Sequence, residues 1–191
     1  AASHVFLRGD PTTSFGNCLV TEYINRPPDP YIMYEDILMQ SVFYSNQCLV
    51  ETNKIGMRNY FEQRGYNNYL CDRPQDTHTS WSHRNTKDPK GIPTTGDSVR
   101  SKMMELLQSY IYNYIGFNKD NQIGICPFNR TLEDWAKFKP DKWTDYDATV
   151  SVMLILSEAN KFSPTPQKSS VKPKELFQRY SNKGMISQKI K

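Results

Sequence analysis

The sequence predicts an α/β fold in which a mixed sheet, made of an antiparallel hairpin plus parallel strands, is flanked by helices. Two strand-like runs near the start are separated by a turn-rich segment, which predicts the hairpin. Short apolar runs then alternate with helical patterns, which indicates parallel strands joined by helical crossovers. With 191 residues and 37% hydrophobic content, the chain can bury one sizeable core but hardly two.

The hairpin comes first and a helix follows it. Ser3–Arg8 and Cys18–Ile24 predict the two strands, because the residues between them are dense in turn formers. Asp29 and Pro30 predict a helix start, with an N-cap followed by proline at the first helical position. This helix is expected to end near Tyr44 and to bury one apolar face. That face comprises Tyr34, Ile37, Leu38 and Val42.

Alternating short elements come next. Cys48–Val50 is an apolar run too brief for a helix, so it predicts a buried strand with Glu51 at its carboxyl end. A helix is expected from there to about Arg64, where Gly65 closes the segment, and Tyr66–Cys71 predicts another strand. Open α/β sheets build their sites at the carboxyl ends of strands, which makes Glu51 a candidate functional residue. A helix cap or a surface ion pair is the alternative reading of this residue.

The rest of the domain is predicted to be a long polar loop followed by helices. The loop spans residues 72–96, and a loop of this length in a compact domain is usually functional or disordered. A long amphipathic helix is expected over about residues 97–115, with Gly116 as its stop. Two shorter helices are predicted from capping-box spacing. Their capping pairs are Thr131 with Asp134 and Thr144 with Asp147.

Charge is distributed unevenly along the chain. The net charge is +4, yet residues 160–191 hold eight basic residues against one acidic residue, so the remainder is slightly acidic. We therefore expect a domain over residues 1–160 and a basic extension over residues 161–191. The extension can bind phosphates or an acidic protein, or simply favour solubility.

Cysteine usage and hydropathy favour a soluble, cytosolic protein. The four cysteines lie far apart and form no C-x-x-C pair, which favours reduced packing residues. No apolar run approaches the roughly 20 residues of a membrane span, so no membrane partner is expected. No signal peptide precedes the predicted fold.

The order of elements is that of the ribonuclease H-like fold without one leading strand. In that fold, carboxylates from the first strand, from the end of the fourth strand and from a late helix bind two divalent metal ions. Glu51 and Asp147 fit the second and third of these positions. Hard cations such as Mg²⁺ or Mn²⁺ prefer oxygen ligands, and two of them about 4 Å apart can support phosphodiester cleavage.

A series of short motifs makes this similarity more specific. They are Thr21–Pro27, Tyr34-Glu35, Val50–Asn53 with Gly56, Tyr60-Phe61, Arg64–Tyr66, Gly91–Thr95 and Tyr146–Val150. In this order they resemble the nuclease domain of tailed-phage terminase large subunits, over roughly residues 3–160. The resemblance implies a metal-dependent endonuclease that cuts double-stranded phage DNA during genome packaging in the host cytoplasm. It also implies the portal or prohead and the small terminase subunit as partners.

Two features depart from that family. Its first catalytic aspartate lies on a strand that should precede Ser3, unless Asp10 fills that role. Asp10 would require Ser3–Arg8 to be the first strand, which leaves no room for the next strand before Cys18–Ile24. No G-x-x-x-x-G-K-[ST] phosphate loop occurs, so the packaging ATPase is absent and a nuclease fragment is expected.

Other acidic residues compete with this pair or support it. Asp147 can cap a helix without binding metal, and Asp145 is an alternative ligand, although two helical residues turn it about 200° from Asp147. Asp72 ends the next predicted strand and can support a second metal ion or hold the basic loop. The candidate DNA contacts are basic residues of that loop, which would hold phosphates without reading sequence. They are Arg73, Arg84, Lys87 and Lys90.

We therefore predict a ribonuclease H-like endodeoxyribonuclease with Glu51 and Asp147 as catalytic metal ligands. Two alternatives stay open. One is a catalytically silent DNA-binding module that docks on the portal or capsid through the basic extension. The other is a different nuclease of the same fold, such as a resolvase or an integrase.

Overall fold

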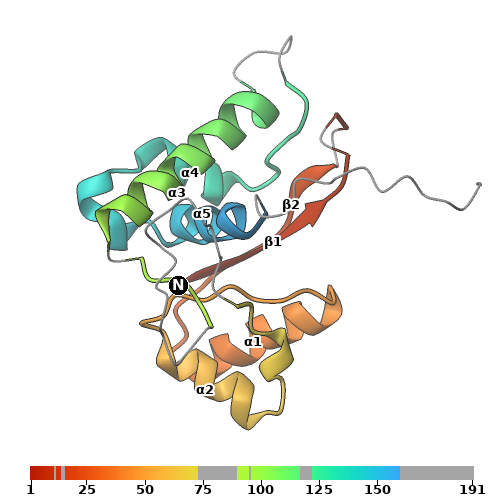
Figure 1. Ribbon diagram of the computed structural model, residues 1–191, viewed down its shortest axis with the longest axis vertical. Helices are drawn as coiled ribbons and strands as arrows, with labels where there is room; N and C mark the ends of the chain where they lie inside the picture. The colour runs from red at the N-terminus through yellow and green to blue at the C-terminus, as the bar shows by residue number, and fades with distance from the viewer. Residues whose placement is uncertain (11, 14–15, 73–89, 95, 117–121, 160–191) are drawn as a thin grey trace, which may run out of the picture. The chain divides into compact units, whose positions relative to one another are not determined.

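The computed structural model describes most of the predicted domain (Figure 1). The chain divides into two units, Ala1–Lys161 and Phe162–Lys191, and the second unit lies outside the described residues. Most of the predicted polar loop also lies outside them. The described residues are 1–10, 12–13, 16–72, 90–94, 96–116 and 122–159.

The predicted hairpin is confirmed. Strand β1 (Ala2–Arg8) pairs antiparallel with β2 (Asn17–Ile24), and the register shifts between Val5 and Phe6. This hairpin is the one sheet within the described part of the chain. Helices cover it on both sides (Figure 1). One side holds α1 (Pro30–Phe43) and α2 (Ile55–Gln63), and the other holds α3 (Asp97–Tyr110), α4 (Asn129–Lys137) and α5 (Asp147–Ala159).

Helix α1 begins as the sequence predicts. The carboxylate of Asp29 accepts a 2.9 Å hydrogen bond from the N–H of Tyr31, so Asp29 is the N-cap. Helices α1 and α2 bury a limited apolar cluster against the segment that contains Val50. This cluster, here called the small core, comprises Ile37, Leu38, Val50, Met57, Phe61 and Leu70.

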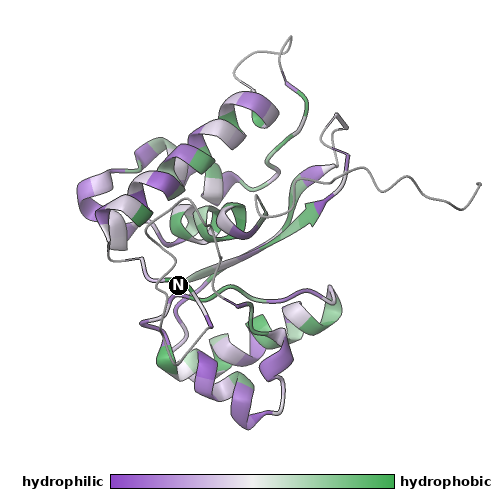
Figure 2. Cartoon of the chain, in the orientation of Figure 1, coloured by the Kyte–Doolittle hydropathy of each residue, from purple (hydrophilic) through white to green (hydrophobic). Residues whose placement is uncertain are grey.

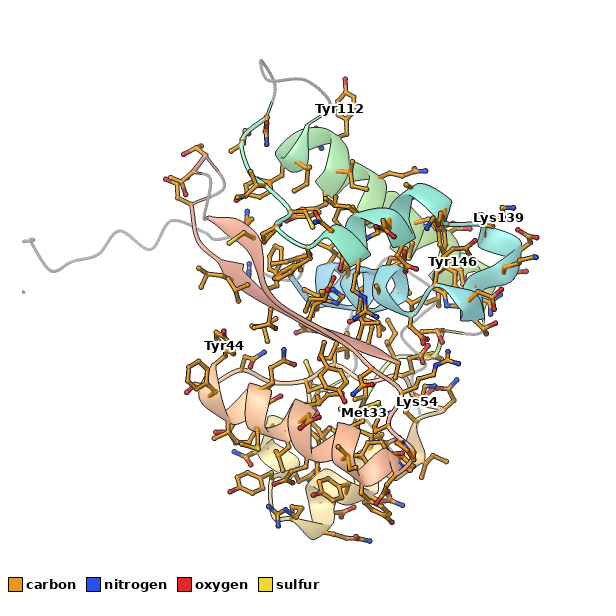
Figure 3. All side chains as sticks on the ribbon, turned by 180° about the vertical axis from the view of Figure 1, so that it is seen from behind. Met33, Tyr44, Lys54, Tyr112, Lys139 and Tyr146 are labelled. Carbon is orange, nitrogen blue, oxygen red and sulfur yellow. The ribbon has the colours of Figure 1, made fainter. Side chains whose placement is uncertain are left out.

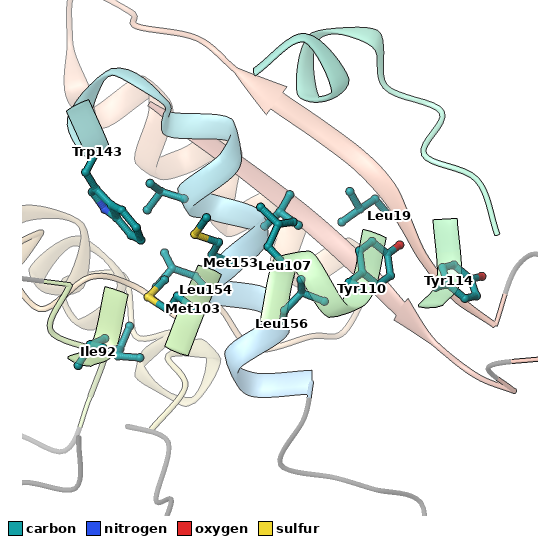
Figure 4. Close-up of a cluster of buried hydrophobic side chains, with 13 residues drawn as sticks. Leu19, Ile92, Met103, Leu107, Tyr110, Tyr114, Trp143, Met153, Leu154 and Leu156 are labelled. Atoms are coloured by element: carbon teal, nitrogen blue, oxygen red, sulfur yellow. The ribbon is translucent and has the colours of Figure 1, made fainter. Parts of the chain in front are cut away.

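A second cluster, here called the large core, lies between the hairpin and helices α3 and α5 (Figure 4). Helix α3 continues into a π-helical turn, η2 (Ile111–Ile115), and ends at Gly116. The φ of Gly116 is 73°, a left-handed value that favours glycine at a helix stop. The large core comprises Leu19, Ile92, Val99, Met103, Leu107, Tyr110, Tyr114, Trp143, Val150, Val152, Met153, Leu154 and Leu156.

The predicted parallel strands are represented only by isolated bridges. Cys48 pairs in parallel with Leu70, and Glu51 pairs in parallel with Ile92. Where a strand was expected after Gly65, a short 3₁₀ helix forms instead, η1 (Asn67–Tyr69). Its consecutive asparagines favour turns over strands. The structure therefore shows a mixed α/β fold with a two-stranded antiparallel sheet.

The capping pairs differ from those that the spacing predicted. Thr131 lies within α4 and Thr144 lies within the 3₁₀ segment η3 (Pro140–Asp145), so neither residue caps a helix. Asp134 accepts hydrogen bonds from the N–H and the hydroxyl of Thr149, at 2.8 and 2.9 Å. Because Thr149 lies in the first turn of α5, Asp134 caps α5 from a neighbouring helix.

The cysteines and the helices bear on two further expectations from composition. The four cysteines are thiols and not disulfides, and Cys18 and Cys71 are buried among packing residues. Within the described ranges, no helix has both the length and the apolar character that crossing a membrane requires.

Candidate functional site

Glu51 lies in the segment that pairs with Ile92, shortly before the start of α2. A backbone hydrogen bond of 2.9 Å from the N–H of Ile92 to the carbonyl of Val50 fixes this segment. The Glu51 side chain is 17% exposed, and its Oε2 lies 3.9 Å from the Nζ of Lys54. Its Oε1 accepts a 2.6 Å hydrogen bond from the hydroxyl of Thr94. The carboxylate is therefore oriented and largely shielded from solvent.

Asp147 is the first residue of α5, where the helix dipole favours a negative charge. Its Oδ2 lies 3.0 Å from a guanidinium nitrogen of Arg26. Partial burial favours a higher pKa for Asp147, but donated hydrogen bonds, that of the Arg26 guanidinium among them, outweigh it and hold this pKa below its ordinary value. Asp147 is therefore ionised at neutral pH.

A series of contacts runs from Glu51 towards the start of α5. Thr94, which holds the Glu51 carboxylate, is 5% exposed, and its carbonyl accepts a 2.9 Å hydrogen bond from Nε of Arg100 in α3. The guanidinium of Arg100 lies 5.3 Å from the ring centroid of Trp143. Trp143 belongs to η3, the segment that leads directly into Asp147. This series links the surroundings of the two predicted ligands.

Asp72 and Lys90 pair with each other. The Nζ of Lys90 lies 2.7 Å from Oδ1 of Asp72 and donates a 2.9 Å hydrogen bond to the carbonyl of Leu70. The Lys90 side chain is 22% exposed, which leaves its ammonium less available to phosphate than the sequence suggests. The other proposed DNA contacts, Arg73, Arg84 and Lys87, lie outside the described residues.

Asp10 and Asp145, the two remaining acidic candidates, are both exposed. Asp10 accepts hydrogen bonds from the N–H and the hydroxyl of Thr12, at 2.9 and 2.6 Å, and these bonds lower the pKa of Asp10. Its carboxylate thus stabilises the hairpin turn. Asp145 is the last residue of η3, two positions before Asp147.

The described residues supply oxygen donors but not a complete cluster of metal ligands. Within the ranges that the structure describes, no group of three or more histidine, cysteine, aspartate or glutamate side chains could hold a metal ion. Glu51 and Asp147 carry the carboxylate oxygens that Mg²⁺ and Mn²⁺ prefer. Each carboxylate already lies near a cationic side chain, Lys54 or Arg26.

A buried polar network that the sequence did not reveal joins the hairpin to α4 and α5. His4 of β1 is 5% exposed and contacts Thr131 of α4 at 2.8 Å through Nε2 and Ser151 of α5 at 3.1 Å through Nδ1. The hydroxyl of Thr131 also donates a 2.6 Å hydrogen bond to Glu22 of β2. His4 and Glu22 are opposite each other in the hairpin register. The predicted hairpin is therefore the one feature of the sequence that could have placed these two residues together.

The hydrogen-bond donors of this network determine which nitrogen of His4 carries the proton. Because the hydroxyl hydrogen of Thr131 goes to the Glu22 carboxylate, its lone pairs accept the Nε2–H of His4. Nδ1 of His4 then accepts the hydroxyl hydrogen of Ser151. Burial lowers the pKa of His4 to about 4, although Glu22 acts in the opposite direction. The ring is therefore neutral at pH 7, and the network holds α4 and α5 on the hairpin.

The chain shows no match to known proteins. No protein-family model, curated protein or solved structure matches it. The resemblance to terminase nuclease domains therefore depends on the sequence motifs alone, and the contacts around Glu51 and Asp147 are the structural observations that bear on function.

Proposed function

We propose that this chain is a ribonuclease H-like nuclease domain that cleaves double-stranded DNA with two Mg²⁺ or Mn²⁺ ions. In this proposal Glu51 and Asp147 are the catalytic metal ligands. The observation that carries it is the series of contacts from Glu51 through Thr94 and Arg100 to Trp143, four residues before Asp147. These contacts support a common site for two carboxylates that are far apart in the sequence.

The residues around the two carboxylates have separate tasks in this proposal. Bound divalent ions supply Lewis acidity and an activated water to such a site. Thr94 fixes one oxygen of Glu51, which leaves the second oxygen facing Lys54. The side chains of Lys54 and Arg26 are 59% and 77% exposed. We expect both cations to contact DNA phosphates when metal ions neutralise the carboxylates beside them.

The biological setting that we propose follows from the motif resemblance. It is the cutting of phage DNA during genome packaging in the host cytoplasm, with the portal or prohead and the small terminase subunit as partners. Arg73, Arg84, Lys87 and Lys90 remain proposed phosphate contacts.

A catalytically silent DNA-binding or portal-docking module is the second candidate function. It is favoured by the concentration of eight basic residues against one acidic residue over residues 160–191. Such a module binds DNA without a metal ion, and its DNA affinity does not depend on Glu51.

Cleavage of supercoiled plasmid tests the proposal, with the chain extended at its amino terminus so that the catalytic aspartate expected before Ser3 can take part. With Mn²⁺ we expect nicking that EDTA abolishes, and we expect Glu51→Gln and Asp147→Asn each to reduce the rate at least about a hundredfold. Glu62→Gln and Asp141→Asn, which alter exposed acids in neighbouring elements, are the matched controls and should cut like the parent. Equal cutting by the site variants rejects the assignment, whereas metal-independent DNA binding without cleavage favours the silent module.

A further inference from the structure

Helix α1 exposes several large apolar side chains to solvent. Ile32 is 51% exposed, Met39 is 62% exposed and Phe43 is 80% exposed. Figure 2 shows the hydrophobic colouring of this helix at its carboxyl end. Contiguous apolar surface of this kind marks interaction sites. We define the outer face of α1 as Ile32, Asp36, Met39 and Phe43.

The outer face forms one stripe along the helix. Its residues follow one another at steps of four, three and four, which is the spacing of a helix-packing seam. The buried residues Ile37, Leu38 and Ser41 occupy the opposite side of α1, so the stripe points away from the small core. Tyr44 projects from the end of the same helix (Figure 3), and its ring centroid lies 4.9 Å from that of Phe43.

The charge around this stripe is acidic. No lysine or arginine occurs between residues 27 and 53, and α1 itself carries Glu35 and Asp36. Glu35 already accepts a 2.9 Å hydrogen bond from Arg64 of α2. Asp36 is exposed, and its carboxylate acts together with burial to raise the pKa of Tyr23. The stripe therefore offers an apolar seam with an exposed acid within it.

This charge pattern discriminates between possible occupants. Two copies packed through their outer faces would bring their Asp36 carboxylates close together, and the outer face holds no basic residue to offset them. An anionic membrane surface would repel the same acids, since helices that bind such surfaces carry lysine and arginine beside their apolar face. A basic amphipathic helix complements both the apolar seam and Asp36.

We propose that the outer face of α1 is a docking surface for a basic amphipathic helix of another protein. The apolar residues of that helix pack on Ile32, Met39 and Phe43, and one of its lysine or arginine side chains pairs with Asp36. This interaction goes beyond the proposed nuclease activity and does not depend on it.

Fluorescence anisotropy with two designed peptides tests the docking surface on the full chain. The basic probe is a helical peptide about three heptads long with leucine at its a and d positions and lysine at e and g. The acidic probe has glutamate in place of each lysine. We expect the basic probe to bind, and Met39→Ser with Phe43→Ser to weaken its binding at least about tenfold. Ile125→Ser, which alters a 43% exposed apolar residue elsewhere, is the matched control and should leave binding unchanged.

A charge reversal separates docking from general stickiness. Asp36→Lys should weaken the basic probe about fivefold or more and strengthen the acidic probe. Binding of the basic probe that neither the Met39/Phe43 change nor the Asp36 change alters would overturn the proposal. Dimerisation in sedimentation equilibrium that Phe43→Ser abolishes would assign the face to a second copy, and would also overturn it. Because these side chains are exposed, circular dichroism should show native folding in every variant.

Discussion

The two apolar clusters of this molecule differ in how completely the chain covers them. The large core contains thirteen buried residues, five of them from helix α5, whereas the small core contains six. The helix that borders the small core exposes Met39 and Phe43. The proposed metal site uses both sides, because Glu51 follows Val50 of the small core and Asp147 begins α5. We therefore expect the large core to supply most of the free energy of unfolding. We expect the α1–α2 side, which leaves apolar side chains exposed, to be the side that contacts other molecules.

Truncation of core side chains should give the largest effect and separates the two cores. Met153, in the large core, is 1% exposed, and Met153→Ala should lower the free energy of unfolding by about 2–5 kcal/mol. Met57→Ala in the small core should fall at the low end of that range, because fewer buried neighbours surround it. Urea denaturation measures both, with Met39→Ala on the exposed face as a control that should be nearly neutral. A larger loss at Met57 than at Met153 would reverse the comparison.

Acid should weaken the large-core side through His4. The pKa of His4 in the fold is about 4, below the ordinary 6.5, so the unfolded chain binds more protons between these values. The contribution of His4 is therefore complete above pH 6.5 and is lost as the pH falls towards 4, by about 3 kcal/mol in total. Urea denaturation at several pH values in this range should show that the free energy of unfolding of His4→Asn depends less steeply on pH than that of the parent. Equal slopes for the two proteins would mean that the ring titrates normally.

Loss of the hydrogen bond from Thr94 to Glu51 should have an intermediate effect on stability. Thr94→Val removes the hydroxyl that donates to Glu51 and should lower the free energy of unfolding by about 1–3 kcal/mol, because a buried acceptor loses its donor. Thr94→Ser keeps the hydroxyl and should recover most of that loss. Thermal unfolding measures both variants. If Thr94→Ser is as unstable as Thr94→Val, the methyl group and not the hydrogen bond holds this position.

Loss of the cap on α5 should give the smallest effect. Asp134→Ala leaves the N–H of Thr149 without its carboxylate and should cost about 0.5–2 kcal/mol. Glu133→Ala removes a neighbouring acid whose pair with Lys137, at 3.5 Å, is exposed, and should be close to neutral. Chemical denaturation of the two variants compares them directly. Matching losses would mean that Asp134 acts only as a surface charge.

Local signals in the sequence predicted the elements that form through local contacts. Turn formers between two apolar runs gave the hairpin, and Asp29 with Pro30 gave the start of α1. The stop at Gly116 was likewise predictable, because it depends on the left-handed conformation of one residue. The prediction was wrong over residues 67–69, where paired asparagines form a 3₁₀ turn although apolar residues surround them.

Contacts between distant segments could not be predicted from spacing. Asp134 lies three residues after Thr131, as a capping box requires, yet it caps a different helix because α4 packs against α5. Glu51 was predicted to lie at the carboxyl end of a buried strand, but this segment forms only isolated bridges, at Cys48 and at Glu51 itself. Thr94, which donates a hydrogen bond to Glu51, is 43 residues away in sequence, so no local pattern predicts this contact. Arg26, which pairs with Asp147, is likewise distant from it in sequence.

Calorimetric titration of Mn²⁺ into the full chain is the most direct test of the claim that Glu51 and Asp147 belong to one metal site. We expect Glu51→Gln and Asp147→Asn each to weaken Mn²⁺ binding strongly, and the double variant to bind little worse than either single variant, because both substitutions remove the same site. Glu62→Gln and Asp141→Asn should bind like the parent. Full Mn²⁺ binding by the single variants, or losses that simply add in the double variant, would contradict a shared site.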